Sequence, residues 1–343
     1  MHVLLVKMSS LGDVLHALPA VTDAASRGIT FDWVVEEAFA AIPARHSAVR
    51  NVIPVSWRRW RSNPGTHRRS LLEFLKVLRS RRYDQILDAQ GLFKSGVVTA
   101  LARGAISSGF SRGSAREGLA SLFYRQRIDV ARDQHAVDRL RQLFAGAFGY
   151  PIPSGPEKFG LGERVERQAM SNRCILLHGT TWMSKHWPES MWCELSARLR
   201  DASFEVDLPW GSMVERDRAE RIAARVPGVR VLDALSLESL VDIINQARLV
   251  VGVDSGLTHL AAALGVPAVV LYGATSAALT GCRGDRVVNL QADFSCVPCL
   301  SRECQYRGAP LMWRDEVVTP TCYARLGPEQ VWAQVGRLLE LQA

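Results

Sequence analysis

The sequence predicts an α/β protein made of two doubly wound domains, and three observations support this fold class. The chain has 343 residues, which suggests about two domains at roughly 150 residues each. Short apolar runs alternate with segments of helical periodicity, as in parallel sheets covered by helices. The segment 149–156 holds three prolines and two glycines, which few helices or strands tolerate, and the alternation restarts after it. We therefore expect domains at 1–150 and 151–343, with the carboxyl ends of both sheets facing a central cleft.

The first domain opens with a strand, a turn and a helix. Segment 3–6 is a continuous apolar run with β-branched ends, which is typical of a buried parallel strand. A turn at 9–13 follows, and apolar residues then repeat at helical spacing from Val14 to Val21. This order begins a doubly wound unit. The other elements predicted for this domain are strands at 31–35, 52–55 and 85–88 and a helix at 70–79.

The second domain repeats the alternation. Strands are predicted at 174–177, 204–208, 229–232, 249–253 and 268–271. Helices are predicted at 191–199, 237–245, 257–264 and 328–341. We also expect that the C-terminal helix can pack back on the first domain.

The composition indicates a folded, basic protein. Apolar residues make up 48% and charged residues 22%, which excludes a disordered chain and a collagen-like fibre. Lys and Arg number 42 against 34 Asp and Glu, a net charge of +8. A basic balance favours an anionic partner, such as a nucleotide, a nucleic acid or an acidic surface.

No membrane span or secretion signal is expected. The most apolar window, 257–274, is interrupted by His259, Gly265 and Pro267, whereas a spanning helix needs about 20 mostly apolar residues. The first ten residues have no basic region before the apolar run and no small-residue cleavage site. Seven cysteines is an odd number, so we expect a cytoplasmic protein with reduced thiols.

The motif KMSSLGD (7–13) follows the first predicted strand. Gly12 lets the backbone approach a ligand, and the next helix offers unpaired N–H groups. Asp13 stands where that helix begins, and its carboxylate can accept a proton from a substrate hydroxyl. Asp is also a common N-cap, so a purely structural role is the alternative. The dinucleotide fingerprint G-x-G-x-x-G is absent after this strand.

The motif VGVDSGLTHL (251–260) joins a buried strand, a turn of small residues and a helix. Such a turn binds anions, because backbone N–H groups and the helix dipole point at it. Ser255 and Gly256 are small enough to admit a diphosphate, and Asp254 can orient the turn or reach a ribose hydroxyl. His259 falls in the first helical turn near the same anion, although a lone His is more often structural. A second turn of small residues, 273–276, is expected beside it.

The motif HGTTWMSKHWP (178–188) follows the strand at 174–177. Thr180 and Thr181 offer hydroxyl groups, and Lys185 offers an ammonium group, to the phosphates of a leaving group. Pro188 is expected at the start of the next helix. On spacing alone, a solvated surface lysine is the alternative interpretation of Lys185.

Basic residues cluster in the first domain. Arginine suits carboxylates and phosphates, so these residues can bind an anionic acceptor. A solvated face is the plainer interpretation, and the interleaved Trp57 and Trp60 also fit nucleic acid. The clustered positions are Arg58, Arg59, Arg61, Arg68, Arg69, Lys94, Arg112 and Arg116.

Four cysteines, Cys296, Cys299, Cys304 and Cys322, have C-x2-C-x4-C-x17-C spacing. Four thiolates can form a tetrahedral zinc site, but only the first pair has the usual spacing, so free thiols are the alternative. No two aspartates lie two residues apart, so the chain has no D-x-D metal motif. We therefore expect a diphosphate to be bound by Lys185 and a helix N-terminus, with no metal and no cofactor.

These motifs together resemble the lipopolysaccharide heptosyltransferases of the ADP-heptose type, and among them heptosyltransferase I. The segments that carry the resemblance are VKMSSLGDVLH (6–16), FDWVVEE (31–37), RRWR (58–61), DAQGL (88–92), KHWP (185–188), LPWG (208–211) and DSGLTHL (254–260). The resemblance runs over nearly the whole chain. It implies a GT-B fold, with two Rossmann-like domains. It also implies transfer of L-glycero-D-manno-heptose from ADP-heptose to the Kdo of nascent lipopolysaccharide, with inversion at the anomeric carbon.

The resemblance also implies roles for single residues. Asp13 is similar to the family's catalytic base, and Lys185 to the lysine that holds the leaving diphosphate. The first domain is implied to bind the Kdo–lipid A acceptor and the second the ADP-heptose donor, at the cytoplasmic face of the inner membrane. The implied donor positions are Thr180, Thr181, Lys185, Glu215, Asp254, Ser255, Gly256 and His259. The implied acceptor positions are Ser10, Arg58, Arg59, Arg61, Lys94 and Arg116.

Three other functions compete with this interpretation. Heptosyltransferase II would add heptose to heptose, but segments 31–37 and 58–61 favour the first transferase. A nucleic-acid-binding protein is suggested only by the charge and the Arg/Trp run, and it has no use for Asp13 or Asp254. A sugar-nucleotide epimerase would need more acid and base groups near the sugar.

Overall fold

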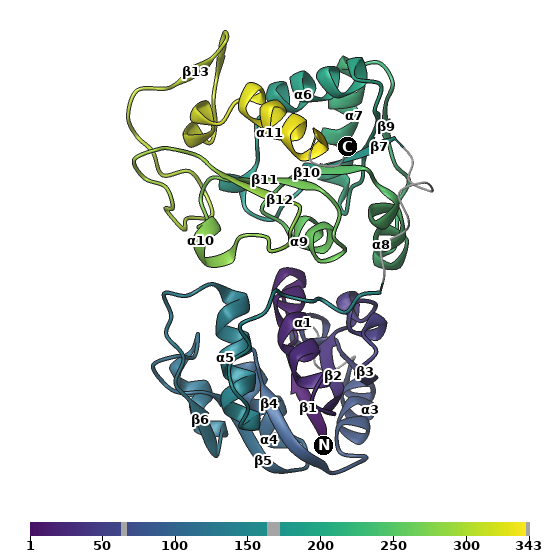
Figure 1. Cartoon of the computed structure of the whole chain (residues 1–343), viewed down its shortest axis with the longest axis vertical. Coiled ribbons are helices and arrows are strands. Elements are labelled where there is room, and N and C mark those ends of the chain that lie inside the picture. Colours follow the sequence, from purple (N-terminus) through teal and green to yellow (C-terminus); the bar gives the residue numbers. More distant parts are fainter. Residues whose placement is uncertain (63–66, 163–171, 341–343) are drawn as a thin grey trace. The chain divides into compact units, whose positions relative to one another are not determined.

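The structure is a computed structural model that describes residues 1–62, 67–162 and 172–340. By its internal contacts the chain separates into two units, Met1–Gly162 and Glu163–Ala343. Each unit is a six-stranded parallel sheet covered by helices (Figure 1). The α/β fold class predicted from the alternating pattern is therefore confirmed.

The first unit has the strand order β3-β2-β1-β4-β5-β6. Its strands are β1 (His2–Val6), β2 (Thr30–Glu36), β3 (Val49–Val55), β4 (Tyr83–Asp88), β5 (Gly104–Phe110) and β6 (Gln126–Ile128). Its helices are α1 (Leu11–Ala25), α2 (Trp57–Ser62), α3 (Arg68–Leu78), α4 (Phe93–Leu101) and α5 (Ala136–Phe148), with short 3-10 helices η1 (Glu37–Phe39), η2 (Pro43–Arg45) and η3 (Gly118–Phe123).

Two groups of helices cover the two faces of this sheet. Helices α1 and α5 pack against each other. Trp60 of α2, Phe74 of α3 and Val98 of α4 share one buried cluster with the strand residues Leu4 and Val6. Right-handed crossovers explain this division, because the chain winds from β1 toward one edge and from β4 toward the other.

The second unit has the strand order β12-β11-β10-β7-β8-β9. Its strands are β7 (Arg173–Leu177), β8 (Glu205–Leu208), β9 (Val229–Val231), β10 (Leu249–Val253), β11 (Ala268–Tyr272) and β12 (Val287–Gln291), and a hairpin is formed by β13 (Met312–Trp313) and β14 (Glu316–Val317). Its helices are α6 (Glu189–Asp201), α7 (Met213–Arg225), α8 (Leu237–Gln246), α9 (Gly256–Ala263), α10 (Ala277–Thr280) and α11 (Pro328–Glu340), with the 3-10 helices η5 (Met183–Lys185) and η6 (Thr321–Arg325).

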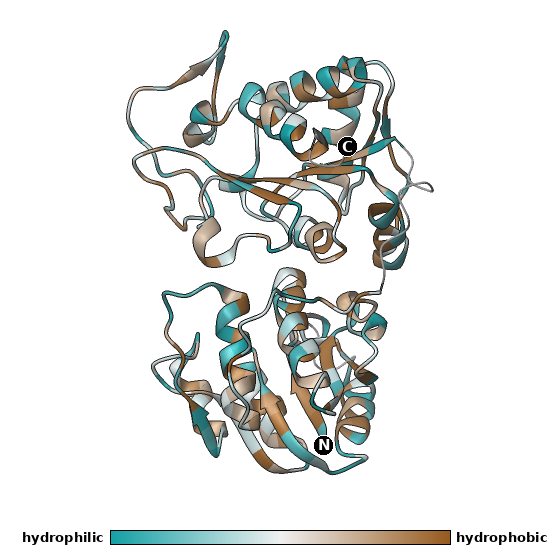
Figure 2. Cartoon of the chain, viewed as in Figure 1, coloured by the Kyte–Doolittle hydropathy of each residue, from teal (hydrophilic) through white to brown (hydrophobic). Residues whose placement is uncertain are grey.

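The core of the second unit lies between its sheet and helices α6, α7 and α11. Trp187 and Trp192 are fully buried there and meet edge to face, with ring centroids 4.9 Å apart. Val331 and Val335 of α11 belong to the same cluster, so α11 packs on α6 and β11 of its own unit. The central strands β1, β10 and β11 are strongly hydrophobic (Figure 2), as expected for strands buried on both faces of a sheet.

The predicted strands all overlap observed ones, and β10 has the predicted bounds. Strand β5 was not predicted, because its sequence GAISSGF contains two glycines and two serines. The sheet needs a glycine there, since a Cβ on Gly109 would overlap the Tyr124 ring. Among the helices of residues 1–62, 67–162 and 172–340, none has the length and apolar character to cross a membrane.

Candidate functional site

The predicted motifs collect where the strand order of each sheet reverses. In the first unit this point lies between β1 and β4, and in the second between β7 and β10. Doubly wound sheets bind ligands at the carboxyl ends of the strands at such a point. The segments that follow these four strands, loops together with the first turns of the next helices, carry Asp13, Lys94, Lys185 and Asp254. The topology therefore brings the predicted residues together in two places, one in each unit.

Asp13 is held at the beginning of α1 by a capping box. The backbone N–H of Ser10 donates to Asp13 Oδ2 at 2.7 Å, and the Ser10 hydroxyl donates to the same oxygen at 3.1 Å. Ser10 is the N-cap and Asp13 the third helical residue, so Asp13 is not the N-cap itself, although its carboxylate takes part in capping the helix. The Asp13 side chain is 31% exposed, which leaves its carboxylate open to a substrate.

A buried lysine, Lys7, lies behind this carboxylate. Its ammonium is 3.8 Å from Asp13 Oδ1 and donates to the Ala89 carbonyl at 3.0 Å. Burial lowers the pKa of Lys7, while the charges of Asp13 and Asp88 act in the opposite direction. Lys7 was not proposed as a site residue. The sequence feature that could have identified Lys7 is its place directly after the apolar run 3–6.

The loop after β4 supports the loop after β1. The Gln90 side-chain oxygen accepts the backbone N–H groups of Met8 and Ser9 at 2.9 and 3.1 Å. Asp88 in turn accepts the backbone N–H groups of Gln90 and Gly91 and the Tyr124 hydroxyl, the last at 2.6 Å. These bonds fix the position of the chain immediately before Asp13.

The predicted acceptor residues divide into two groups. Lys94 donates to the Ser9 hydroxyl at 3.2 Å, and the charge of Arg116 acts on Lys7, so both lie beside the Asp13 loop. Arg59 instead pairs with Glu37 at 3.0 Å, in the helix that follows β3. The side chains of Arg58 and Arg61 lie outside the described part of the chain.

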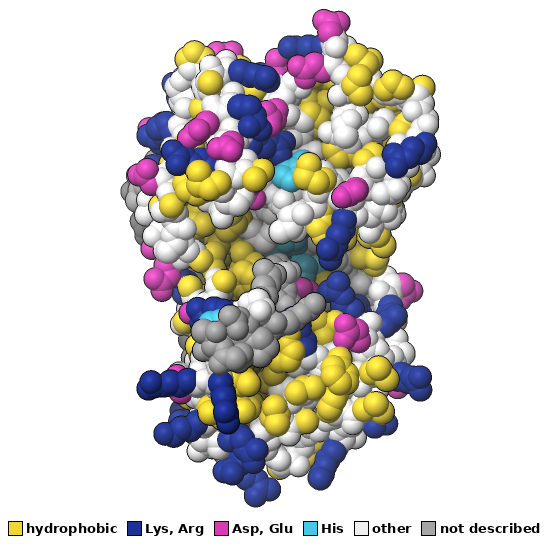
Figure 3. Space-filling model, turned by 180° about the vertical axis from the view of Figure 1, so that it is seen from behind, with side chains coloured by type: hydrophobic (Ala, Val, Ile, Leu, Met, Phe, Trp, Pro, Cys, Tyr) yellow, Lys and Arg dark blue, Asp and Glu magenta, His cyan; other side chains and the backbone are white. Residues whose placement is uncertain are grey.

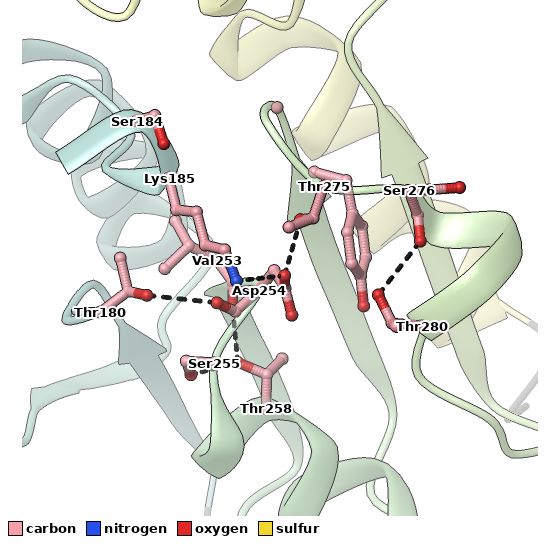
Figure 4. Close-up of polar contacts among 12 residues, drawn as sticks. Thr180, Ser184, Lys185, Val253, Asp254, Ser255, Thr258, Thr275, Ser276 and Thr280 are labelled. Carbon is pink, nitrogen blue, oxygen red and sulfur yellow. Dashed lines mark hydrogen bonds and ion pairs between the residues drawn. The ribbon is translucent and has the colours of Figure 1, made fainter. Parts of the chain in front are cut away.

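In the second unit, Asp254 is the centre of a polar cluster (Figure 4). Its Oδ2 atom is 2.7 Å from the Lys185 ammonium and accepts the Thr275 hydroxyl at 2.6 Å. Its Oδ1 atom is 3.4 Å from His259 Nε2. Thr180 donates to the Asp254 backbone carbonyl at 3.3 Å. Three loops and one helix therefore meet at a single carboxylate.

The electrostatics of the cluster follow from burial and pairing. Burial acts to raise the pKa of Asp254, but the hydrogen bond of His259 and the charge of Lys185 hold it well below its usual value. Burial acts to lower the pKa of His259, but the neighbouring Cys282 and Asp254 raise it to about 10. The Cys282 thiol is 3.3 Å from His259 Nδ1. The cluster thus gathers the ammonium of Lys185 and the imidazole of His259, whose pKa is raised, around one carboxylate.

The remaining predicted donor residues surround this cluster. Thr181 is exposed next to Thr180. Glu215, in the first turn of α7, accepts the Gly211 backbone N–H at 2.7 Å, and a Cβ on Gly179 would overlap its carboxylate. Glu215 therefore lies against the loop that carries Thr180. Ser255 is the N-cap of α9, and Gly256 is the first residue of that helix.

Two features of this region were not predicted as site residues. Thr275 lies in the turn of small residues after β11, the strand next to β10, and its hydroxyl donates to Asp254. The Lys185 ammonium also lies 4.7 Å from the centre of the Trp182 ring, a cation–π contact. The sequence feature that could have identified Thr275 is its place in the turn of small residues 273–276, directly after a predicted strand.

The four clustered cysteines line one cavity, together with Ser184, Ala274 and Tyr306. All seven cysteines of the chain are free. Within the part of the chain that the structure describes, no three His, Cys, Asp or Glu side chains are placed to hold a metal ion. Burial raises the pKa of Cys322 to about 12, and its three neighbouring cysteines act in the same direction.

Comparisons with known proteins agree with this geometry. A family model described as glycosyltransferase family 9 (heptosyltransferase) matches residues 71–309. Lipopolysaccharide heptosyltransferase 1 of Pseudomonas aeruginosa is 46% identical, covering 99% of this chain and 98% of that protein. The protein of the same name from Escherichia coli K12 is 45% identical over 82% of this chain and 90% of its own length.

Solved structures show the same similarity. The E. coli heptosyltransferase WaaC with ADP-2-deoxy-2-fluoro heptose has a TM-score of 0.81 at 37% identity, covering 98% of this chain and 99% of its own. E. coli heptosyltransferase II has a TM-score of 0.74 at 20% identity over the full length of both chains, and so shares the fold.

The fold is the GT-B fold of glycosyltransferases, made of two doubly wound units with the polar clusters described above at their switch points. The chain belongs to glycosyltransferase family 9, the heptosyltransferases. The prediction of a glycosyltransferase is thereby confirmed. A nucleic-acid-binding protein and an epimerase are not favoured.

Proposed function

We propose that the protein transfers L-glycero-D-manno-heptose from ADP-heptose to a Kdo sugar of Kdo–lipid A, as a heptosyltransferase I. The second unit binds the donor and the first binds the acceptor. The relatives that are 45–46% identical over most of the chain carry the name heptosyltransferase 1. A heptosyltransferase 2 of Haemophilus influenzae matches only 27% of the chain, at 33% identity.

The observation that carries the reaction is the partly exposed carboxylate of Asp13, fixed at a switch point. Asp13 Oδ2 accepts hydrogen bonds from both the backbone N–H and the hydroxyl of Ser10, so the carboxylate cannot rotate freely. An oriented carboxylate can accept the proton of a sugar hydroxyl. Lys94 and Arg116 lie beside it and suit the carboxylate of a Kdo residue.

The Asp254 cluster supports the donor half of the proposal. A diphosphate placed against Lys185 and the N-terminus of α9 meets an ammonium group and unpaired backbone N–H groups. The WaaC structures contain ADP or an ADP-heptose analogue, and both are similar to this chain over at least 85% of its length. Glu215 lies next to the same loop and can accept hydrogen bonds from ribose hydroxyls.

The proposed reaction is a single displacement at the anomeric carbon. The Kdo hydroxyl oxygen forms the new bond as Asp13 takes its proton. The bond from the anomeric carbon to the β-phosphate oxygen breaks, and ADP leaves from the opposite face with the electron pair. Attack opposite the leaving group inverts the configuration. Lys185 and the α9 N–H groups stabilise the charge that grows on ADP.

The test is ADP release by the purified protein from ADP-heptose in EDTA, with and without de-acylated Kdo–lipid A. We expect release that depends on the acceptor and does not need a divalent metal. Release only with an acceptor that already carries heptose would show heptosyltransferase II activity instead. No release with either acceptor would contradict the proposal.

The acceptor chemistry also suggests where the protein works. Kdo–lipid A is an anionic glycolipid of a membrane surface, so we place the enzyme on the cytoplasmic face of the inner membrane as a peripheral protein. Fractionation of cells should recover part of it with membranes at low salt and release it at high salt, since surface electrostatics are screened by salt.

A further inference from the structure

Helix α3 of the first unit is strongly basic. The segment 68–82, which contains α3 and the turn after it, holds six basic residues and a single acidic residue, Glu73. All six basic residues are exposed; Arg69 pairs with Glu73 at 3.1 Å and Arg81 with Asp32 at 3.8 Å. The reaction described above does not use this segment. The six basic residues are Arg68, Arg69, Lys76, Arg79, Arg81 and Arg82.

The same helix exposes large apolar side chains. Phe74 and Leu78 face the core, yet Leu72 is 56% exposed and Val77 is 49% exposed. Leu72 has Arg68 one turn before it and Lys76 one turn after it, so an apolar side chain stands between two cations. A purely solvated helix face would carry polar residues at these positions.

The neighbouring elements continue this surface. Helices α3 and α4 pack on the same face of the sheet, since Phe74 and Val98 share one cluster. Phe93 of α4 is 49% exposed and its ring lies 5.4 Å from that of Phe123 in η3. On η3, Leu119 is 58% and Leu122 is 69% exposed. Figure 3 shows hydrophobic side chains gathered on this unit, with Lys and Arg side chains beside them.

Basic residues that surround exposed apolar side chains are the chemistry that binds an anionic bilayer. Clusters of four to eight Lys and Arg on an amphipathic helix are attracted to acidic headgroups, and apolar side chains insert at the boundary of headgroups and acyl chains. Nucleic acid would use the same charges but gains nothing from exposed Leu and Val side chains.

We propose that this surface, α3 with its following turn together with Phe93, Leu119 and Leu122, docks the protein on an anionic lipid bilayer. Its purpose rests on the proposed lipid acceptor, because docking would place the enzyme at the surface where that acceptor lies. The docking itself is a binding property that is measured without any turnover.

The test is flotation of the full-length protein with lipid vesicles. Vesicles of phosphatidylcholine with one third phosphatidylglycerol should carry the protein upward at low salt. Pure phosphatidylcholine vesicles, or 0.5 M salt, should release most of it, because the charge attraction is then missing or screened.

Two variants separate the charge from the apolar contact. Arg79→Glu with Arg82→Glu should weaken vesicle binding at least about tenfold, since each Lys or Arg near such a surface contributes roughly fivefold. Leu72→Gln should weaken it about fivefold, since part of a Leu side chain no longer leaves water. Matched controls are Arg307→Glu and Val317→Gln in the second unit, where Val317 is 57% exposed.

Two further results decide between this proposal and its rivals. Transfer to a de-acylated, water-soluble acceptor should be unchanged in both variants, while transfer to Kdo–lipid A in anionic vesicles should fall with binding. Vesicle binding that is equal in the α3 variants and the controls would overturn the proposal. So would binding of RNA or DNA without vesicle binding. An enzyme that binds vesicles through α3 but transfers no heptose would contradict the proposed function and leave the docking surface standing.

Discussion

Each unit presents an aspartate beside the switch point of its sheet, but the two side chains have opposite surroundings. Asp13 follows β1 in the first unit, and Asp254 follows β10 in the second. The Asp13 side chain is 31% exposed, and its closest cation, Lys7, is 3.8 Å away. Asp254 is 9% exposed and lies 2.7 Å from Lys185, with His259 and Thr275 on its other sides.

This difference supports the different roles proposed for the two carboxylates. A buried carboxylate surrounded by two cations and a hydroxyl has no free capacity to take a proton, so Asp254 positions Lys185. Asp13 is fixed by Ser10 but keeps access to solvent, so it can act on a substrate. We therefore propose that, of the two aspartates beside the switch points, Asp13 is the reacting group and Asp254 the positioning group.

The largest expected effect is on turnover when Asp13 is changed. Asp13→Ala should lower kcat by about 10² to 10⁴, the usual contribution of a general base. The Kd for ADP-heptose should stay near the wild-type value, because Asp13 belongs to the acceptor half. Steady-state ADP release and calorimetric titration of the donor measure both. Asp133→Asn, at an exposed position, is the control.

Lys185→Met should have the next largest effect on the rate of transfer. Loss of one charge-stabilising group at a leaving diphosphate typically costs about 10² to 10³ in rate. Unlike Asp13→Ala, this change should also weaken ADP binding, since in the proposed site the ammonium faces the diphosphate before and after the reaction. Lys158→Met, an exposed lysine, should change neither quantity. Unaltered ADP affinity in Lys185→Met would mean that Asp254 holds the lysine away from the donor.

Asp254→Asn should affect stability more than chemistry. This change removes the buried negative charge that faces Lys185 and His259, and breaking a buried ion pair typically lowers the free energy of unfolding by about 3 to 5 kcal/mol. Thermal or urea unfolding of the ligand-free protein measures it. A loss well below 1 kcal/mol would show that the cluster does not depend on the charge of Asp254.

The ion pair of Asp254 and His259 predicts that the stability of the protein depends on pH. The pKa of His259 is raised from 6.5 to about 10, so its contribution to stability is complete below pH 6.5 and is lost as the pH rises through about 10. The pKa of Asp254 is lowered, so its contribution is present above pH 3.8, the ordinary value, and is lost at lower pH. Between pH 6.5 and 10 the wild type should lose stability relative to His259→Gln. A constant difference across this range would contradict the raised pKa.

The smallest effect should come from Thr275→Val. It removes one buried hydrogen bond to Asp254, a change of about 1 kcal/mol in the free energy of unfolding. Thr280→Val, which removes a longer bond to the Ser276 carbonyl at 3.2 Å, is the matched control. A larger loss in Thr280→Val would show that Thr275 has no special part in holding Asp254.

The elements that the sequence predicted well are those whose own residues determine them. The strand at 249–253 consists of five buried residues and has the predicted bounds. Strand β5 escaped prediction because its glycine is required by Tyr124, a residue of another segment. Local patterns report burial, but they do not report which distant ring a small residue must accommodate.

The candidate site also has a part that the sequence predicts, the motifs, and a part that it does not, the contacts between them. The motifs around Asp13, Lys185 and Asp254 were visible because small residues and charges follow apolar strands. The hydrogen bonds between these motifs could not be predicted, because Lys185 and Asp254 are 69 positions apart in the sequence and Thr275 and Asp254 are 21 apart. The strand order places them side by side, and no pattern within a single segment contains that order.

The most direct test of the central claim compares Asp13→Asn with Asp254→Asn in a single turnover, with saturating ADP-heptose and soluble acceptor. We predict that Asp13→Asn binds the donor normally and loses the transfer step by at least about 10². Asp254→Asn should bind the donor more weakly and transfer heptose at a rate closer to that of the wild type once saturated. A near-normal transfer rate in Asp13→Asn, or a deeper loss in Asp254→Asn at saturation, would contradict the assignment of the two carboxylates.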